Sequence, residues 1–151
     1  MPKPDFYLYE RRLPHWRLRG AAYFITWRLA DGQPDLTPDE RSLVAAALRH
    51  FDAERYTLFA FVIMNDHAHA IVTPAQNYRL QDLVHSWKSF SAHGLRRGGR
   101  RAPVWQDGYF DRIVRNEAEL REKARYIVNN PWKRWPDLQE YPWLWVQGLE
   151  E

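Results

Sequence analysis

A chain of 151 residues is long enough for one domain with a hydrophobic core of its own, and we expect a single domain over residues 1–151. The absence of cysteine excludes thiolate metal sites and a disulfide framework. The formal net charge is only +3, yet 18 of the 22 basic residues are arginine, whose guanidinium binds phosphate oxygens bidentately. Together with eight tryptophans this composition favours a nucleic-acid partner, although an arginine-rich coding bias gives the same count.

Residues 1–20 mix aromatic and basic side chains and form what we expect to be an N-terminal arm. Pro14 disfavours a helix there, which leaves an extended conformation. Such an arm can hold a DNA backbone and stack a base, or it can lie across the domain as packing, and both interpretations stay open. No apolar stretch typical of a signal peptide is present, so we expect a cytoplasmic protein that does not enter a membrane. The candidate DNA contacts in the arm are Arg11, Arg12, His15 and Trp16.

The first regular elements are a strand and a helix. Residues 21–29 alternate in side-chain character with the period of a strand. After a turn at residues 31–34 the chain shows a helix start, with Thr37 as N-cap, Pro38 at N1 and Glu40 at N3. The apolar face of this helix consists of Leu43, Val44, Ala47, Leu48 and Phe51.

A strand, a tight turn and a second strand follow over residues 58–72. Residues 58–64 are a short apolar run, and the turn formers at 65–66 interrupt it. Beyond the turn the residues alternate, so His67 and His69 share one strand face with Cα atoms about 6.6 Å apart. Both imidazoles can then reach one metal ion or one phosphate. Two polar residues on a hydrated strand face are the simpler interpretation, and the buried-looking strand before them favours a site.

A second helix and a basic loop come next. Apolar residues recur at helical spacing and predict a helix over residues 78–94. Lys88 lies off its apolar stripe, where a lysine is usually solvated but can also reach a phosphate. The loop after the helix either binds phosphates or is solvated, and it carries four arginines in six residues: Arg96, Arg97, Arg100 and Arg101.

The last third of the chain predicts a hairpin, a helix and an irregular tail. Residues 104–114 indicate strand, Asp-Gly turn and strand. Asn116 caps a third helix that we expect to run to Asn130 and to stop before proline. Tyr126 lies on the polar flank of that helix, one turn before Asn130. The tail, residues 132–151, contains four tryptophans and should pack back on the domain.

Several chemistries are excluded by missing motifs. The chain has no Gly-rich phosphate loop followed by Lys-Ser/Thr, no His-Glu-x-x-His and no Gly-x-Ser-x-Gly. Ile71 stands where a third histidine of a His-x-His-x-His motif would be needed. What remains is a tyrosine nucleophile that attacks a phosphodiester polarised by a metal on two histidines.

An ordered set of short motifs resembles the REP-associated tyrosine transposases, a group of HUH single-strand endonucleases in the IS200-like superfamily. The resemblance covers nearly the whole chain, whereas a lone His-x-His would be weak. Its most specific pieces are Leu13-Pro-His-Trp16, Tyr23-Phe-Ile-Thr26, Met64-Asn-Asp-His-Ala-His69, Trp87-Lys-Ser-Phe90, Trp105-Gln-Asp-Gly-Tyr-Phe-Asp-Arg112 and Tyr126-Ile-Val-Asn-Asn-Pro131.

The resemblance implies roles for individual residues. Tyr126 becomes the nucleophile, while His67, His69 and Asn130 hold Mg²⁺ or Mn²⁺. Arg112 joins the candidate DNA contacts. The implied substrate is single-stranded or hairpin DNA of the REP type, bound by a monomer or homodimer near the nucleoid. A catalytically silent, domesticated hairpin-binding protein is the alternative.

The element order predicts an α+β fold with a central antiparallel sheet covered by helices. The resemblance implies the same, a ferredoxin-like HUH endonuclease fold with the histidine strand in the middle of the sheet.

Overall fold

The computed structural model describes residues 13–149, and this part of the chain forms three helices and five strands. In chain order these are β1 (Ala22–Arg28), α2 (Pro38–Arg49), β2 (Tyr56–Ile63), β3 (His67–Pro74), α3 (Leu80–Arg97), β4 (Phe110–Val114), α4 (Glu117–Arg134) and β5 (Leu144–Val146). The helix start at Thr37 is confirmed, because its side chain accepts from the Glu40 amide while the Glu40 carboxylate accepts from the Thr37 amide.

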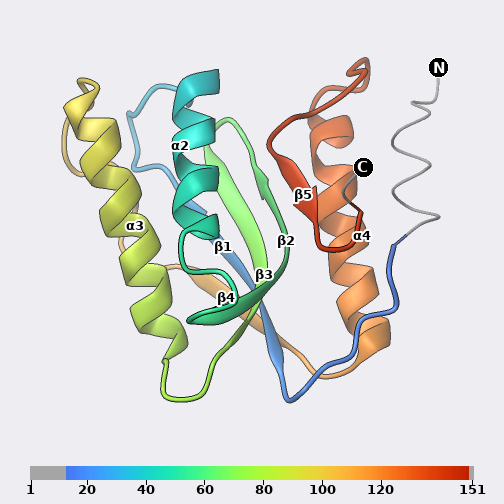
Figure 1. Ribbon diagram of the computed structural model, residues 1–151. Helices are drawn as coiled ribbons and strands as arrows, with labels where there is room; N and C mark the ends of the chain where they lie inside the picture. The colour runs from blue at the N-terminus through green and yellow to red at the C-terminus, as the bar shows by residue number, and fades with distance from the viewer. Residues whose placement is uncertain (1–12, 150–151) are drawn as a thin grey trace.

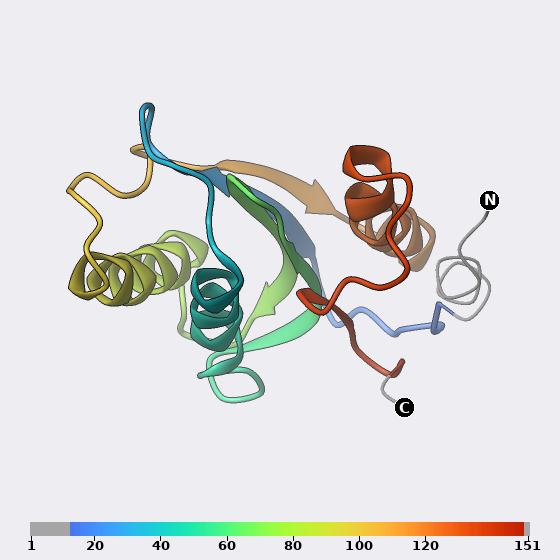
Figure 2. The same cartoon turned by 90° about the horizontal axis from the view of Figure 1, so that it is seen from above.

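The five strands form one antiparallel sheet in the order β4-β1-β3-β2-β5. The first four strands with α2 and α3 reproduce the split βαββαβ arrangement of ferredoxin-like folds, to which α4 and β5 are added. Helices α2 and α3 cover one face and α4 covers the other, as Figures 1 and 2 show. The predicted α+β class and the central place of the histidine strand are therefore confirmed.

Both faces of the sheet carry apolar side chains, so the molecule has two cores. On the α2 and α3 side, Ile25 and Trp27 of β1 pack with Val44 and Trp87 from the helices. The second core, between the sheet and α4, contains Phe24, Phe59, Val62, Ile71, Leu120 and Ile127. A sheet buried on both sides holds each strand in register, because a slip of one residue would exchange the two sets of side chains.

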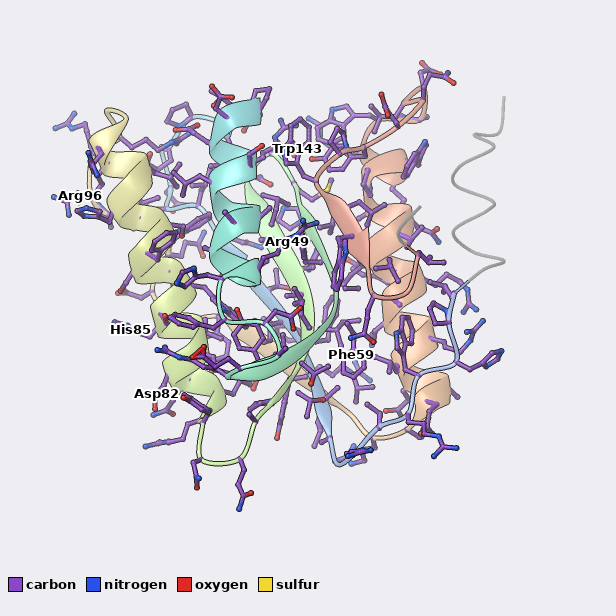
Figure 3. The ribbon with its side chains drawn as sticks, in the orientation of Figure 1. Arg49, Phe59, Asp82, His85, Arg96 and Trp143 are labelled. Carbon is purple, nitrogen blue, oxygen red and sulfur yellow. The ribbon has the colours of Figure 1, made fainter. Side chains whose placement is uncertain are left out.

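The predicted basic loop is partly wrong, because α3 continues three residues beyond position 94 and includes Arg96 and Arg97 in its last turn. Leu95 is buried on the core side of that turn, and cations near a helix C-terminus interact favourably with the helix dipole. Gly98 then forms the C-cap. The helix ends at the upper left of Figure 3, where Arg96 is labelled.

Arg100 is a structural residue. Its Nε and Nη2 donate to the two Glu40 carboxylate oxygens at 2.7 and 2.8 Å. Nη1 donates to the Gln33 side chain and to the carbonyl of Pro34, and Nη2 also donates to the carbonyl of Asp35. All five N–H donors of the guanidinium are used within the chain, so the prediction that Arg100 contacts DNA is withdrawn.

The predicted hairpin at 104–114 does not form. Trp105 makes an isolated bridge with Leu29 of the segment after β1, and only Phe110–Val114 continues as a strand. The reason lies in α3, because Lys88 donates to the carbonyls of Gln106 and Gly108, both at 2.7 Å. The Trp105 indole also donates to the Ser91 hydroxyl at 3.0 Å. These bonds hold the segment on the helix, and they use two of the three donors of Lys88.

The third helix does not stop at Asn130, because α4 runs through Pro131 to Arg134. A proline inside a helix removes a backbone hydrogen bond and costs about 3 kcal/mol or more. Pro131 and Trp132 are both buried, Trp132 in the second core, and this burial offsets the cost. The tail packs back as expected, and its residues Leu144–Val146 add an unpredicted strand beside β2.

The described part of the N-terminal arm lies against α4. Leu13 and Trp16 are buried in the second core, and Trp16 packs edge-on against Phe59, which lies between β2 and α4 in Figure 3. Arg121 of α4 donates to the carbonyls of Leu13 and Pro14. None of the helices formed by residues 13–149 is long and apolar enough to cross a membrane.

We predict that Arg100→Ala lowers the free energy of unfolding by about 3 kcal/mol at neutral pH, because the Glu40 carboxylate loses its bidentate partner. Arg100 holds the pKa of Glu40 below its ordinary 4.5. A carboxylate with a lowered folded-state pKa stabilises the fold above its unfolded pKa, and this stabilisation is lost as the pH falls through the folded value. The difference between the variant and the native protein should therefore shrink below pH 4.5.

Denaturant unfolding at a series of pH values measures this difference. Arg100→Lys is the control, since it keeps the charge without the planar fork and should recover only part of the stability. Equal stability of the native protein and Arg100→Ala at neutral pH contradicts the structural role.

Candidate functional site

The histidine pair lies at the start of β3, the central strand. His67 follows the turn at residues 65–66 directly, and the Met64 amide donates to the His67 carbonyl at 2.8 Å to close that turn. The ring centroids of His67 and His69 are 4.8 Å apart. Both side chains point to the α4 side of the sheet, the face that also holds Ile71 and Phe24.

His69 is held from two directions. Thr26 stands directly opposite it on β1, and the Thr26 hydroxyl lies 2.7 Å from His69 Nδ1. Phe24 stacks on the imidazole with ring centroids 5.2 Å apart. Only 3% of the His69 surface is exposed, and this burial lowers its pKa to about 3, with nearby His67 and Arg28 acting in the same direction. The ring is neutral near pH 7.

His67 is also neutral near pH 7, and its Nδ1 has a different oxygen partner from that of His69. Its Nδ1 lies 2.7 Å from an Asp66 carboxylate oxygen. Burial lowers the His67 pKa, and the hydrogen bond that the Asp66 carboxylate accepts from the His67 ring opposes that effect in part. In both histidines Nδ1 is thus occupied by an oxygen, which leaves Nε2 as the ligand atom, and a neutral imidazole is the form that binds metals.

Tyr126 comes from α4 and lies beside the histidines of its own chain. Burial of Leu120, Ala124 and Ile127 against the sheet sets the rotation of the helix, so Tyr126 sits on its flank with 43% of its surface exposed. Its ring centroid is 5.5 Å from that of His69 and 5.6 Å from that of Phe24. The structure therefore places an accessible phenol next to the histidine pair.

A pocket of about 400 Å³ opens beside His67, and Asn130 lines it. Three cationic side chains share the lining: Arg28 from the end of β1, and Lys133 and Arg134 from the last turn of α4. The Lys133 ammonium also lies 5.5 Å from the centre of the Tyr126 ring. A larger hollow of about 660 Å³ around Trp135 and Trp143 contains none of the predicted site residues.

The residues present fit a divalent metal ion. Within residues 13–149 no cluster of three or more His, Cys, Asp or Glu side chains could hold one. Two neutral imidazoles therefore need further oxygen ligands, and the pocket beside His67 offers side-chain oxygens of Asn130, Asn65 and Asp66. Open coordination positions would remain for phosphate oxygens, as Mg²⁺ sites commonly leave them. Two imidazoles alone suit zinc or another transition metal equally well.

The predicted DNA contacts are placed very differently by the structure. Arg11 and Arg12 lie outside the described residues, and Trp16 is buried in the second core, where it cannot stack a base. Lys88 and Arg100 bind groups of the chain itself. The exposed candidates that remain are His15, Arg96, Arg97, Arg101 and Arg112.

Sequence reasoning missed Thr26, Arg28, Lys133 and Arg134. A signal existed for the first two, because both lie on one face of β1 at the spacing of two residues. That signal could not be used without knowing that β1 pairs with the histidine strand. Lys133 and Arg134 were assigned to a tail because the helix was expected to end before Pro131.

Comparisons with known proteins give one family match and similar folds. The family model described as "Transposase IS200 like" matches residues 36–130, more than half of the chain. A REP-associated tyrosine transposase bound to a REP hairpin superposes with a TM-score of 0.69 at 19% identity, over 88% of this chain and 81% of that one. A candidate transposase of Deinococcus radiodurans R1 superposes with a TM-score of 0.54 at 18% identity, over 76% of this chain and 91% of that one. No curated protein sequence matches the chain.

We predict that Thr26→Val weakens Mn²⁺ binding about 10- to 100-fold, the usual effect of losing the partner that orients a histidine ligand. Valine has the same shape but cannot bond His69 Nδ1, whereas Thr26→Ser keeps the hydroxyl and should keep the affinity. Thr73→Val on β3 is the matched control, because the Thr73 hydroxyl is buried and has no hydrogen-bond partner among the described residues. Calorimetric titration with Mn²⁺ measures the three variants, and an unchanged affinity of Thr26→Val contradicts the positioning role.

Proposed function

The chain belongs to the IS200-like transposase family, and on that premise we propose that it is a metal-dependent tyrosine transposase that binds DNA hairpins and cuts and rejoins single-stranded DNA. Membership of the family assigns the chain to the transposases in general. The nucleophile, the metal ligands and the hairpin substrate are our proposal. The neighbour whose fold is similar was solved with a REP hairpin, which supports DNA of that kind as the partner.

One observation carries the proposal: the exposed Tyr126 lies edge-on to His69, with ring centroids 5.5 Å apart, inside a single chain. The two residues come from different elements, β3 and α4, which are far apart in the sequence. Tyr126 lies inside α4, and its position on the helix flank brings the ring against buried His69 while leaving it accessible. The same geometry supports an active site completed within one chain, with no partner chain needed to supply the nucleophile.

In the proposed reaction the Tyr126 oxygen forms a bond to the scissile phosphorus while the bond to the 3′-oxygen of the preceding nucleotide breaks. The phenol loses its proton and the departing 3′-oxygen gains one. The products are a 5′-phosphotyrosine link and a free 3′-hydroxyl. Because one phosphodiester replaces another, the reverse attack by a 3′-hydroxyl rejoins DNA without ATP.

The protein groups around Tyr126 have separate tasks. His67, His69 and Asn130 would hold Mg²⁺ or Mn²⁺, which when bound polarises the scissile phosphate as a Lewis acid. The Lys133 ammonium lies 5.5 Å from the centre of the Tyr126 ring, where its positive charge would favour the phenolate that forms when the phenol loses its proton. Arg28 and Arg134 line the same pocket and suit neighbouring phosphates of the strand.

A catalytically silent hairpin-binding protein is the second candidate function. The basic lining of the pocket beside His67 would serve a binder equally well. The hydrogen bonds of Thr26 and Asp66 to the two histidines favour the enzyme, because binding alone does not require imidazoles oriented by oxygens.

We predict that Tyr126→Phe abolishes a covalent protein–DNA band that the native protein forms with hairpin DNA in Mg²⁺. The change removes only a hydroxyl at a half-exposed position, so folding and hairpin binding should persist. A denaturing gel with labelled hairpin oligonucleotides from around the protein's own gene detects the band. Chelation of the metal should remove the band as well.

Tyr78→Phe is the matched control, since Tyr78 is 40% exposed and lies just before α3, the helix that covers the face of the sheet opposite α4. It should leave the band unchanged. A band that persists in Tyr126→Phe assigns the nucleophile to another tyrosine. If the native protein forms no band but binds the hairpin, the silent binder is correct.

We predict that replacing Arg96, Arg97 and Arg101 together by alanine flattens the salt dependence of hairpin binding by about 0.7–0.9 in log–log slope for each phosphate that the protein no longer neutralises. Arg100 is kept because it holds Glu40. Arg49→Ala is the control, since the Arg49 guanidinium lies over Phe61 and Trp145 near the C-terminal end of α2 (Figure 3). Affinity titrations at several salt concentrations give the slopes, and an unchanged slope in the triple variant means that these arginines are only solvated.

A further inference from the structure

Phe110 is the most exposed large apolar side chain among residues 13–149, with 59% of its surface accessible. It opens β4, which lies at the edge of the sheet beside β1. Four of the five residues of β4 are exposed, although the other strands are largely buried. A single exposed aromatic ring is ordinary by itself, and its significance here comes from where Phe110 lies relative to the histidine site.

The register of the sheet puts Phe110 in line with the histidine site. Phe110 pairs with Thr26 on β1, and Thr26 pairs with His69 on β3. Side chains of directly opposed residues in an antiparallel sheet point to the same face. Phe110, Thr26 and His69 therefore form one row on the α4 side of the sheet, and Phe110 is two strands, or about 10 Å, from His69.

Helix α4 leaves the Phe110 end of this row open. The helix packs mainly on β2, β3 and β5. In the view from above β4 starts away from α4 and runs toward it (Figure 2). Tyr126 marks the boundary, because its ring contacts Phe24 and His69 and is still 43% exposed. A single strand of DNA whose scissile phosphate lies at Tyr126 can thus continue over β1 towards β4.

Three cationic side chains lie around this open surface. Arg112 is exposed and pairs with Phe24, so it lies on the same face as Phe110, two residues along β4. Lys123 of α4 lies 5.6 Å from the centre of the Phe24 ring. Arg28 ends the same face of β1. An aromatic ring among cations matches a single-stranded nucleic acid, whose bases stack and whose backbone is anionic.

We propose that Phe110 stacks on an unpaired nucleobase next to the scissile phosphate and that Arg112 binds a backbone phosphate of the same segment. This inference rests on the proposed function, because it takes Tyr126 as the position of the scissile phosphate. Phe110 is a positioning residue that orders the strand for attack. A second copy of the chain paired to the β4 edge is the competing occupant, and the cations on this face disfavour it because two copies would bring like charges together.

The test compares Phe110→Ala with Phe90→Ala. Phe90 is 55% exposed and stacks on His50 on the other side of the sheet, so it is matched in type and exposure. The probe is a hairpin oligonucleotide with single-stranded arms, bound in Mg²⁺ by protein carrying Tyr126→Phe so that the DNA stays intact. Phe110→Ala should raise the dissociation constant about 10- to 100-fold, the effect of removing one base stack. Phe90→Ala should leave it unchanged, and Phe110→Trp should retain tight binding.

A series of probes with one abasic position each then locates the base. One abasic position in the arm should weaken binding to the Phe110 protein and have no further effect on the Phe110→Ala protein. Equal abasic penalties in both proteins at every position overturn the inference. So does an unchanged affinity of Phe110→Ala, or a change from dimer to monomer with DNA affinity retained.

The outcome is separable from that of the proposed function. If protein with Tyr126 intact forms the covalent band but every abasic probe costs the same affinity in the Phe110 and Phe110→Ala proteins, the base stacking is rejected and the proposed nuclease activity stands. Non-additive penalties without any covalent band keep the stack and reject the catalytic assignment.

Discussion

The antiparallel pairing of β1 with β3 is the constraint on which the site depends. It sets Thr26 opposite His69 and Arg28 opposite His67, so the orienting hydroxyl and the pocket cation arrive together with the imidazoles. A slip of one residue would turn both histidines toward α2 and α3. The large side chains on that opposite face, above all Ile25 and Trp27, are buried and resist such a slip. The core facing away from the site is therefore what holds the site in register.

Burial has a chemical consequence at this position. A histidine in the middle of a doubly covered sheet pays a large desolvation cost when it is protonated, so His69 stays neutral with a pKa of about 3. The same burial would hide the pair from a substrate if α4 covered the whole face. The helix instead lies over β2, β3 and β5, and its flank brings Tyr126 to the open border. Burial therefore keeps His69 neutral, and the flank of α4 leaves the site accessible.

The arginines show why composition gives little information about binding. Arg100 and Arg121 are bonded to groups of the chain itself, the first to Glu40 and the second to the carbonyls of Leu13 and Pro14. Arg28 and Arg112 have the same side chain, and their register positions place them on the histidine face. A phosphate-binding role requires a guanidinium whose donors are free, and only the tertiary structure shows which donors are used.

The sequence by itself determined what local patterns encode: the capped helix after Thr37, the turn before His67, the two histidines on one strand face, and Tyr126 one turn before Asn130. These depend on periodicities of two and 3.6 residues and on capping chemistry, which act over a few positions. The tertiary structure alone decided the features that local rules contradict or ignore. Helix α4 passes through Pro131 because Pro131 and Trp132 are buried, residues 105–109 leave the sheet because Lys88 and Ser91 bind them, and Arg100 turns inward to Glu40. In each case the feature is stabilised by a contact with a residue distant in sequence or by burial against the rest of the fold. Such contacts and such burial exist only once the chain is folded.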